Sequence, residues 1–398
     1  MSPFIPIIMS FSQITLRDEL GKPVDARYRG PRVMTMNIDN VNVCIVNGLR
    51  RVIKANIPTV IIDRKSVKVN ANMSPLNDDI IRDRLELTPI HLDDEQLKSW
   101  HDSGPYTFHI KMHNKTTTTV PVTSKSIQVY SIANRAIVSD KIRDELFPPS
   151  PVSGDHVVLA YLRPSPSNSE ELDIEFNAIK GTGSKLHNPT SICSHVYRVD
   201  DALAAKQFEI DSKTAPGLEM SQFLTLAGKK CYKKDAYGDA TEMEMTVHSE
   251  TCLSPGFLVT SAFDYMIERV GDLPIRMKQG NNFEIKEIDA VNNAYRVTLG
   301  DENHTMGSLI QALLYGHWRN GDKVRSIGYN QPHPSEDIIV IKIQLARAGD
   351  DVSEVLLEGF AWVKEHLEGV KAAFVDAYAA AAAPAPAAAV KTEKVVKV

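Results

Sequence analysis

Two separated stretches of the chain repeat one order of hydrophobic patterns. In the first, residues 33–38 alternate apolar and polar side chains, which predicts a strand. Apolar side chains then recur at helical spacing until Pro58, which ends the helix. Asp39 and Asn40 are suitable caps for this helix, because their side-chain oxygens accept bonds from the first free backbone amides. The β-branched run 59–62 predicts a second strand.

The second stretch, in the C-terminal half, follows the same order. Its predicted elements are strands at 295–299, 324–329 and 338–345, a helix whose apolar side includes residues 306–314, and a rigid bend at Gln331–Pro334. Asp351 begins a long helix in which Val, Leu and Phe recur at helical spacing as far as Phe374. We therefore expect two similar halves.

The last elements of the first half come much later in the chain. Residues 243–247 alternate like a strand. Ser254 caps a helix that has Pro255 in its first turn, where proline is tolerated, and Gly271 is its expected end. We therefore predict an insert at residues 89–240. We expect it to be β-rich, because alternating segments occur at 106–112, 127–130, 157–162 and 172–179.

Composition predicts a globular protein of a reducing, intracellular compartment. The 398 residues are 43% hydrophobic and 24% charged, and the net charge of −5 opposes a role in binding nucleic acid with the whole surface. The four cysteines are Cys44, Cys193, Cys231 and Cys252. Their spacing matches no common metal motif, so we predict no metal and no cofactor. No apolar run is long enough to cross a bilayer. The Ala/Pro/Lys-rich segment 379–398 is predicted to be disordered.

The first stretch and the insert contain several distinctive strings. They are Asn47–Arg51 (NGLRR), Ile57-Pro58, Asn70–Asp78 (NANMSPLND), Arg82–Pro89 (RDRLELTP), and Ala178–Gly183 (AIKGTG) with His187 and Pro189. Together they resemble the alpha-like subunits of multisubunit DNA-directed RNA polymerases. That family includes the bacterial alpha amino-terminal domain, the archaeal D subunit and the third subunit of eukaryotic RNA polymerase II.

The second stretch contains an independent set of strings. They are Asp301–Gly307 (DENHTMG), Gly328-Tyr329 and Pro332–Pro334 (PHP). These strings resemble the archaeal L subunit and the eleventh subunit of the eukaryotic enzyme. The presence of both partners in one polypeptide resembles the fused subunit of large nucleocytoplasmic DNA viruses. Archaeal and eukaryotic members often carry a cysteine cluster in the insert, which the scattered cysteines of this chain do not form.

The resemblance implies an α+β fold of two pseudo-symmetric alpha-type dimerisation halves packed through their helices, with the β-rich insert in the first half. The implied domains are residues 1–88 with 241–280 for the D-like first half, 89–240 for the insert, 281–378 for the L-like second half, and 379–398 for the tail.

The same resemblance implies a non-catalytic assembly platform without a cofactor. Its partners would be the largest and second-largest polymerase subunits and smaller subunits, with no membrane and at most indirect contact with nucleic acid. Arg50 and Arg51 are expected to dock the second-largest subunit, because an arginine fork binds carboxylates through paired hydrogen bonds. A viral origin would place the protein in a cytoplasmic factory and in the virion. The subunit-interface residues implied by the motifs are Asn47, Leu49, Arg50, Arg51, Pro58, Asn72, Ser74, Arg84, His304, Thr305, Gly307, Leu313, Gly328, Tyr329, His333 and Pro334.

Simpler interpretations and other classes of function stay open. Arg50 and Arg51 also fit an ordinary helix end stabilised by the helix dipole. A metal-dependent hydrolase needs convergent ligands, and His304 with His317 or His333 lacks the close spacing of a tetrahedral site. His304 is more simply interpreted as a capping or packing residue beside Thr305. A free-standing nucleic-acid-binding protein is suggested by the Lys-rich tail and opposed by the net charge.

Overall fold

The computed structural model describes residues 9–18, 20–24, 30–40, 42–101, 104–164, 170–182, 193–249, 251–318 and 323–382. These residues form an α+β structure with nine α-helices and antiparallel sheets, the fold class that the resemblance implies. None of the described helices is both long enough and apolar enough to span a bilayer. The predicted loop residues Gly183, His187 and Pro189 lie outside the described residues, as does the predicted tail beyond Ala382.

The first sheet joins strands that are far apart in the chain. It contains β1 (Ser10–Asp18), β2 (Arg32–Asp39), β11 (Glu242–Ser249) and β10 (Cys193–Tyr197), paired in that order. The strands predicted at 33–38 and 243–247 are confirmed. Sequence alternation does not reveal β1, because a register shift between Ser12 and Thr15, with Gln13 at φ 49°, interrupts it.

The second sheet belongs wholly to the C-terminal half. It contains β12 (Phe283–Asp289), β13 (Ala294–Gly300), β15 (Ile338–Leu345) and β14 (Val324–Asn330), paired in that order. The three strands predicted in this half are confirmed. β12 was not expected, because its alternation extends only from Phe283 to Lys286 before a register shift between Glu287 and Asp289 interrupts it.

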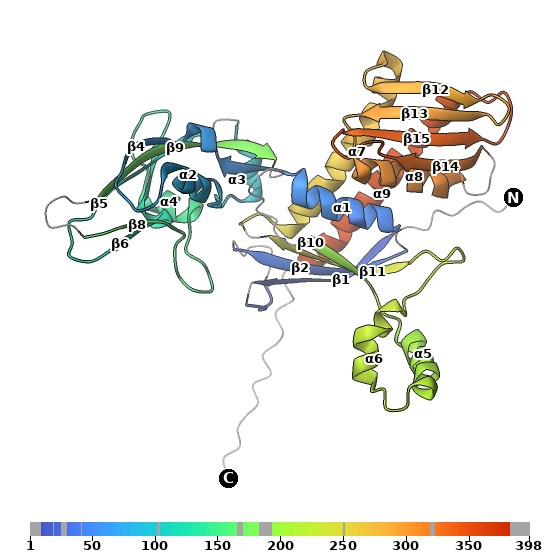
Figure 1. Cartoon of the computed structure of the whole chain (residues 1–398), viewed down its shortest axis with the longest axis horizontal. Helices are drawn as coiled ribbons and strands as arrows, with labels where there is room; N and C mark the ends of the chain where they lie inside the picture. The colour runs from blue at the N-terminus through green and yellow to red at the C-terminus, as the bar shows by residue number, and fades with distance from the viewer. Residues whose placement is uncertain are drawn as a thin grey trace, which may run out of the picture.

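Four helices lie between these two sheets (Figure 1). They are α1 (Val43–Ala55), α7 (Pro255–Gln279), α8 (His304–Trp318) and α9 (Val352–Ala382). Helix α1 contacts α7 and α8, and α9 contacts α7, α8 and the strand β1. The helices of the two halves therefore share one hydrophobic core, which is what amphipathic helices with a wide apolar stripe require.

Two predicted helix boundaries are wrong. The cap of α1 is Asn42, whose side chain accepts a hydrogen bond from the backbone of Cys44, whereas Asp39 ends β2. Helix α7 continues beyond Gly271 to Gln279, because Leu273 on its inner face is buried and Met277 packs against the core. It ends at Gly280, whose φ of 64° suits a glycine cap.

The insert sheet lies to one side of the two sheets and their helices (Figure 1). It contains β3 (Pro58–Ile62), β4 (Lys68–Asn72), β9 (Glu171–Thr182), β5 (Tyr106–His113) and β7 (Ile127–Ser131), with β9 pairing to β3, β4 and β5. Around it lie the pair β6 (Val120–Thr123) and β8 (Val158–Leu162) and the helices α2 (Asp78–Glu86), α3 (Asp94–Ser99) and α4 (Asp140–Leu146). The four predicted strands are confirmed. The pairing of β3 and β4 shows that this sheet draws on residues before position 89.

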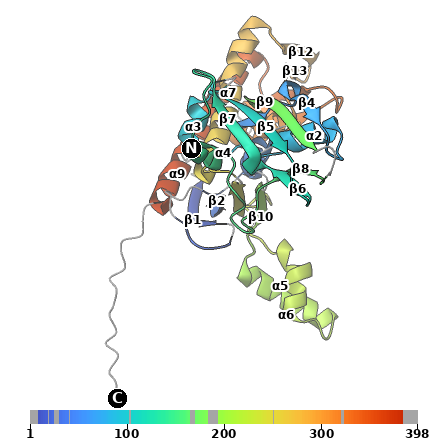
Figure 2. The same ribbon diagram turned by 90° about the vertical axis from the view of Figure 1, so that its left-hand side faces the viewer.

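The last part of the predicted insert is not β-rich. After β10 the chain forms a helical arm of α5 (Asp201–Thr214) and α6 (Met220–Leu226), which projects away from the sheets (Figure 2). Asp200 caps α5 by accepting from two backbone amides. An effective cap followed by alanines favours a helix over a strand.

A charged network holds the base of this arm to the first sheet. The Arg198 guanidinium lies 2.9 Å from an Asp39 carboxylate oxygen and also bonds Glu242. Lys233 Nζ lies 2.7 Å from the other oxygen of Glu242. The hydrogen bonds from Lys233 and Arg198 hold the pKa of Glu242 below its usual value.

We predict that Glu242→Gln lowers the free energy of unfolding at pH 7 by about 1 kcal/mol, because bonds to a charged group are lost. A carboxyl group whose pKa is lowered by folding stabilises the protein above its unfolded pKa, and this contribution is lost as the pH falls. The difference in the free energy of unfolding between the wild type and the variant should therefore shrink as the pH is lowered. Urea unfolding across a pH series measures it. Glu244→Gln, on the same strand and exposed, is the control, and an equal effect of both variants would contradict the prediction.

Candidate assembly interface

The helix layer is closely packed where glycines face large side chains. A Cβ added to Gly48 of α1 would lie 3.1 Å from the Met266 sulfur of α7. A Cβ on Gly359 of α9 would overlap the Trp318 ring of α8. Gly359 therefore leaves no room for a Cβ, whereas at Gly48 the flexible Met266 side chain would have to move by a few tenths of an ångström. Both contacts involve helices that join the two halves or brace the joint between them.

One hydrogen bond links α1 directly to α8 at the edge of this layer. Arg51 Nε donates to Thr305 Oγ1 at 2.6 Å. The Thr305 backbone amide in turn donates to the Asn303 side chain at 2.9 Å. Asn303, and not His304, therefore provides the side-chain oxygen at the start of α8. The His304 ring is exposed and meets the edge of the Tyr329 ring, with centroids 6.0 Å apart.

The two predicted docking arginines have different surroundings. Arg50 folds back on its own helix, where Nε and Nη2 both donate to Asn47 Oδ1 at 3.1 Å. Its charge lies near β10, where burial, together with the Arg50 charge, lowers the pKa of His195. Arg51 instead contacts the second half. Arg50 is therefore the better candidate for a contact outside the chain.

The remaining first-half motif residues brace the insert and lie away from the α1–α8 contact. Asn72 donates to the Leu76 carbonyl at 2.9 Å and to Asp78 at 2.8 Å, and it accepts from the Ser74 hydroxyl at 2.7 Å. Arg84 donates to the Leu159 carbonyl of β8 at 3.2 Å. Pro58 begins β3 and is exposed. The sequence motif thus covers two places in the fold.

The second-half motif residues also divide into a buried and an exposed set. Leu313 is buried in the helix layer, as is Leu49 of the first half. Gly307 lies so close to Tyr329 that an added Cβ would come within 2.7 Å of its ring. Gly328, His333 and Pro334 are exposed on β14 and the bend that follows it. The exposed set is available to a partner and contributes little to the core.

Sequence reasoning missed a buried ionic link between the halves. Glu302, only 3% exposed, accepts from Arg269 Nη2 at 2.7 Å and Arg276 Nη1 at 2.9 Å on the same carboxylate oxygen. Arg276 also donates to the Asn282 and Gly300 carbonyls. Burial raises the pKa of Glu302, and the two arginines oppose that shift. The available signal was the spacing of Arg269 and Arg276, two turns apart on one face of α7.

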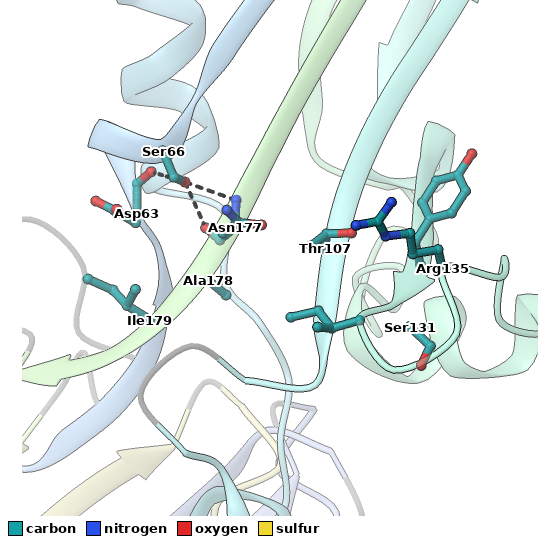
Figure 3. A pocket seen from close by; sticks show the side chains of 10 residues that line it. Asp63, Ser66, Thr107, Ser131, Arg135, Asn177, Ala178 and Ile179 are labelled. Carbon is teal, nitrogen blue, oxygen red and sulfur yellow. Dashed lines mark hydrogen bonds between the residues drawn. The ribbon is translucent and has the colours of Figure 1, made fainter.

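Figure 3 shows a hollow in the insert region. It lies on the insert sheet, with Asp63, Ser66 and Asn177 on one side and Thr107 and Arg135 on the other. The Ser66 hydroxyl bonds the Asp63 carbonyl at 2.7 Å and accepts from the Asn177 amide at 2.9 Å. The Ser66 hydroxyl thus ties the segment that follows β3 to β9.

The geometry defines two sheet-and-helix halves joined through their helices. The family model for the RNA polymerase Rpb3/Rpb11 dimerisation domain matches residues 294–373, which include β13, α8, β14, β15 and most of α9. These residues include Thr305 and Glu302, whose side chains bond to α1 and α7 respectively.

Known polymerase subunits of two kinds are similar to the chain. It is 25% identical over 254 residues to the DNA-directed RNA polymerases I and III subunit rpac1 of Dictyostelium discoideum, covering 58% of this chain and 69% of that protein. It is 24% identical over 196 residues to human RPAC1, covering 44% of this chain and 54% of that protein. It is 35% identical over 80 residues to a probable RPAC2 of Caenorhabditis briggsae, covering 20% of this chain and 52% of that protein. The chain thus spans about half the length of the last two relatives. The matches support an alpha-like RNA polymerase subunit.

We predict that Leu313→Asp lowers the free energy of unfolding by more than about 3 kcal/mol, because it places a charge in the buried helix layer. Tyr315→Asp, on the same helix at a position that is 43% exposed, should cost less than about 1 kcal/mol. Urea unfolding of both variants measures the difference. A soluble Leu313→Asp variant with wild-type stability would contradict the burial of this helix face.

We also predict that Glu302→Gln destabilises the protein by about 3 kcal/mol, because it leaves two arginines facing a neutral amide. Glu284→Gln is the control, since its ion pair with Lys286 at 2.8 Å is exposed and should contribute at most about 1 kcal/mol. Equal melting temperatures for the two variants would show that the Glu302 link contributes nothing to the joint.

Proposed function

We propose that this chain is a non-catalytic assembly platform of a DNA-dependent RNA polymerase, with an RPAC1-like and an RPAC2-like part in one polypeptide. The observation that carries the proposal is the shared helix layer, in which α1 and α7 of the first half pack on α8 and α9 of the second. Matches to relatives of both kinds support the fusion.

Covalent joining suits this layer. Helix α7 ends at Gln279 and β12 begins at Phe283, so a very short connection separates the halves. A short connection converts the meeting of two subunits into an intramolecular step at high effective concentration. Pairing is then independent of protein concentration, and Arg51–Thr305 and Glu302 select one arrangement of the joint.

The proposed partners are the two largest catalytic subunits, one held mainly by each half, with smaller subunits beside them. Arg50 is proposed to contact the second-largest subunit, since a half-buried guanidinium with a fixed orientation is suited to a carboxylate. The exposed residues Gly328, His333 and Pro334 are proposed contacts of the second half. We further propose an intracellular, reducing site of action and, if the fusion is of viral origin, a cytoplasmic factory and the virion.

We predict that the tagged full-length chain, purified from its native source, retains two much larger subunits, identified by mass spectrometry. Arg50→Ala should reduce retention of the second-largest subunit at least about fivefold, as for a typical interface arginine, and leave the melting temperature unchanged. Lys54→Ala, one turn further along α1 and exposed, is the matched control.

Each outcome of this experiment has a definite meaning. Equal retention by both variants would contradict the role of Arg50 while leaving the platform intact. A chain that purifies without large partners would contradict the platform itself. Tight, salt-sensitive binding of that lone chain to duplex DNA would instead favour a nucleic-acid-binding protein.

A further inference from the structure

A ladder of polar side chains crosses one face of the insert sheet. Strands β5 and β9 pair so that each side chain of one lies opposite a side chain of the other. The opposed pairs are His109 with Glu175, Lys111 with Asp173, and His113 with Glu171. Because alternate residues of a strand share a face, all six side chains lie on the same side of the sheet.

At one end of the ladder three side chains converge. His109 Nε2 lies 3.0 Å from Asp173 Oδ1. The nearest ligand atoms of His109, Asp173 and Glu175 all lie within 4.8 Å of one another. From β4, Asn70 Nδ2 lies 2.9 Å from Asp173 and 3.3 Å from Glu175. Three strands therefore direct polar atoms at one point.

We propose that His109, Asp173 and Glu175 form a binding site for a divalent transition-metal ion of the zinc type. One imidazole nitrogen and two carboxylate oxygens are the donor set that such ions accept, whereas the imidazole disfavours magnesium and calcium. Metal–ligand bonds of about 2.0–2.2 Å place donors roughly 3–3.6 Å apart, so small side-chain rotations complete the site. Water supplies the fourth position.

The charges around the site explain why a cation would be held. Two carboxylates on neighbouring positions of one sheet face repel each other. The side chains of His109 and Asp173 are 20% and 15% exposed, so solvent screens this repulsion incompletely. Asn70 can turn its amide to present an oxygen in place of its nitrogen, since both ends of the group have the same shape.

The Lys111 ammonium group would compete with a metal ion for the Asp173 carboxylate. Its ammonium nitrogen lies 3.0 Å from the second oxygen of Asp173. The Lys111 side chain is 56% exposed, so it can turn into solvent when a metal ion binds. The competition has a direct consequence, because removing the ammonium group must strengthen metal binding. A purely structural ladder of ion pairs has no such property.

The test is calorimetric titration of the chelator-treated full-length chain with zinc chloride, together with its melting temperature with and without zinc. We expect one zinc ion per chain at this site and a rise in melting temperature. His109→Gln should weaken zinc binding at least about tenfold and abolish the rise, since loss even of a supporting residue costs that much. Lys111→Ala should bind zinc more tightly than the wild type.

His113→Gln is the matched control. His113 Nδ1 lies 3.1 Å from Glu171 on the same two strands, but this pair lies at the other end of the ladder. The His113→Gln variant should therefore bind zinc with the affinity of the wild type. Glu175→Gln replaces His109→Gln if that variant fails to fold, because Glu175 is exposed. Absence of saturable binding, or equal affinity in the wild type, His109→Gln and Glu175→Gln, overturns the proposal and assigns any bound zinc to other groups such as the cysteines.

Discussion

Burial of one shared helix layer is the constraint on which the rest of the molecule depends. The Phe374 ring, near the end of α9, packs against the rings of Phe11 of β1 and Phe263 of α7. The ring centroids are 5.3 Å and 6.4 Å apart, respectively. A side chain from the second half thus completes the core of the first. Burying such a ring contributes roughly 2–3 kcal/mol. Neither half could expose these helix faces to water without losing many such contributions, so the two halves must fold against each other.

Polar contacts at the edge of the helix layer fix the relative positions of its helices. Apolar contacts alone permit helices to slide, because the hydrophobic effect is not directional. The Arg51–Thr305 bond sets the position of α1 along α8, and Glu302 fixes the far end of α7. Gly359 leaves space for the Trp318 ring of α8 to pack directly against α9. Register and spacing are consequently determined by a few residues, and the surrounding side chains supply the energy.

Sequence patterns predicted those elements whose periodicity is local. The strand at 338–345 is confirmed because β-branched apolar residues dominate it, and the helix around Leu313 because its apolar positions follow helical spacing. β1 was missed because its bulge breaks the period, and α7 was predicted too short because Gly271 was taken as its end. Leu313 was identified as a buried residue by the same helical periodicity. Sequence patterns did not identify the role of Glu302. The two residues that bond to it, Arg276 and Arg269, lie 26 and 33 positions away, and only the fold brings them together.

The insert is attached to the helix layer by specific bonds as well as by the chain. Asp94, in the first turn of α3, accepts from the Ser254 backbone amide at 2.8 Å and from its hydroxyl at 2.6 Å, while the same hydroxyl caps α7. On the other side of α3, Lys180 of β9 donates to the Leu97 carbonyl at 2.8 Å. Helix α3 therefore connects the insert sheet to the first turn of the helix that holds both halves. These bonds tie the orientation of the insert sheet to that of α7, so the two are coupled through α3 as well as through the chain.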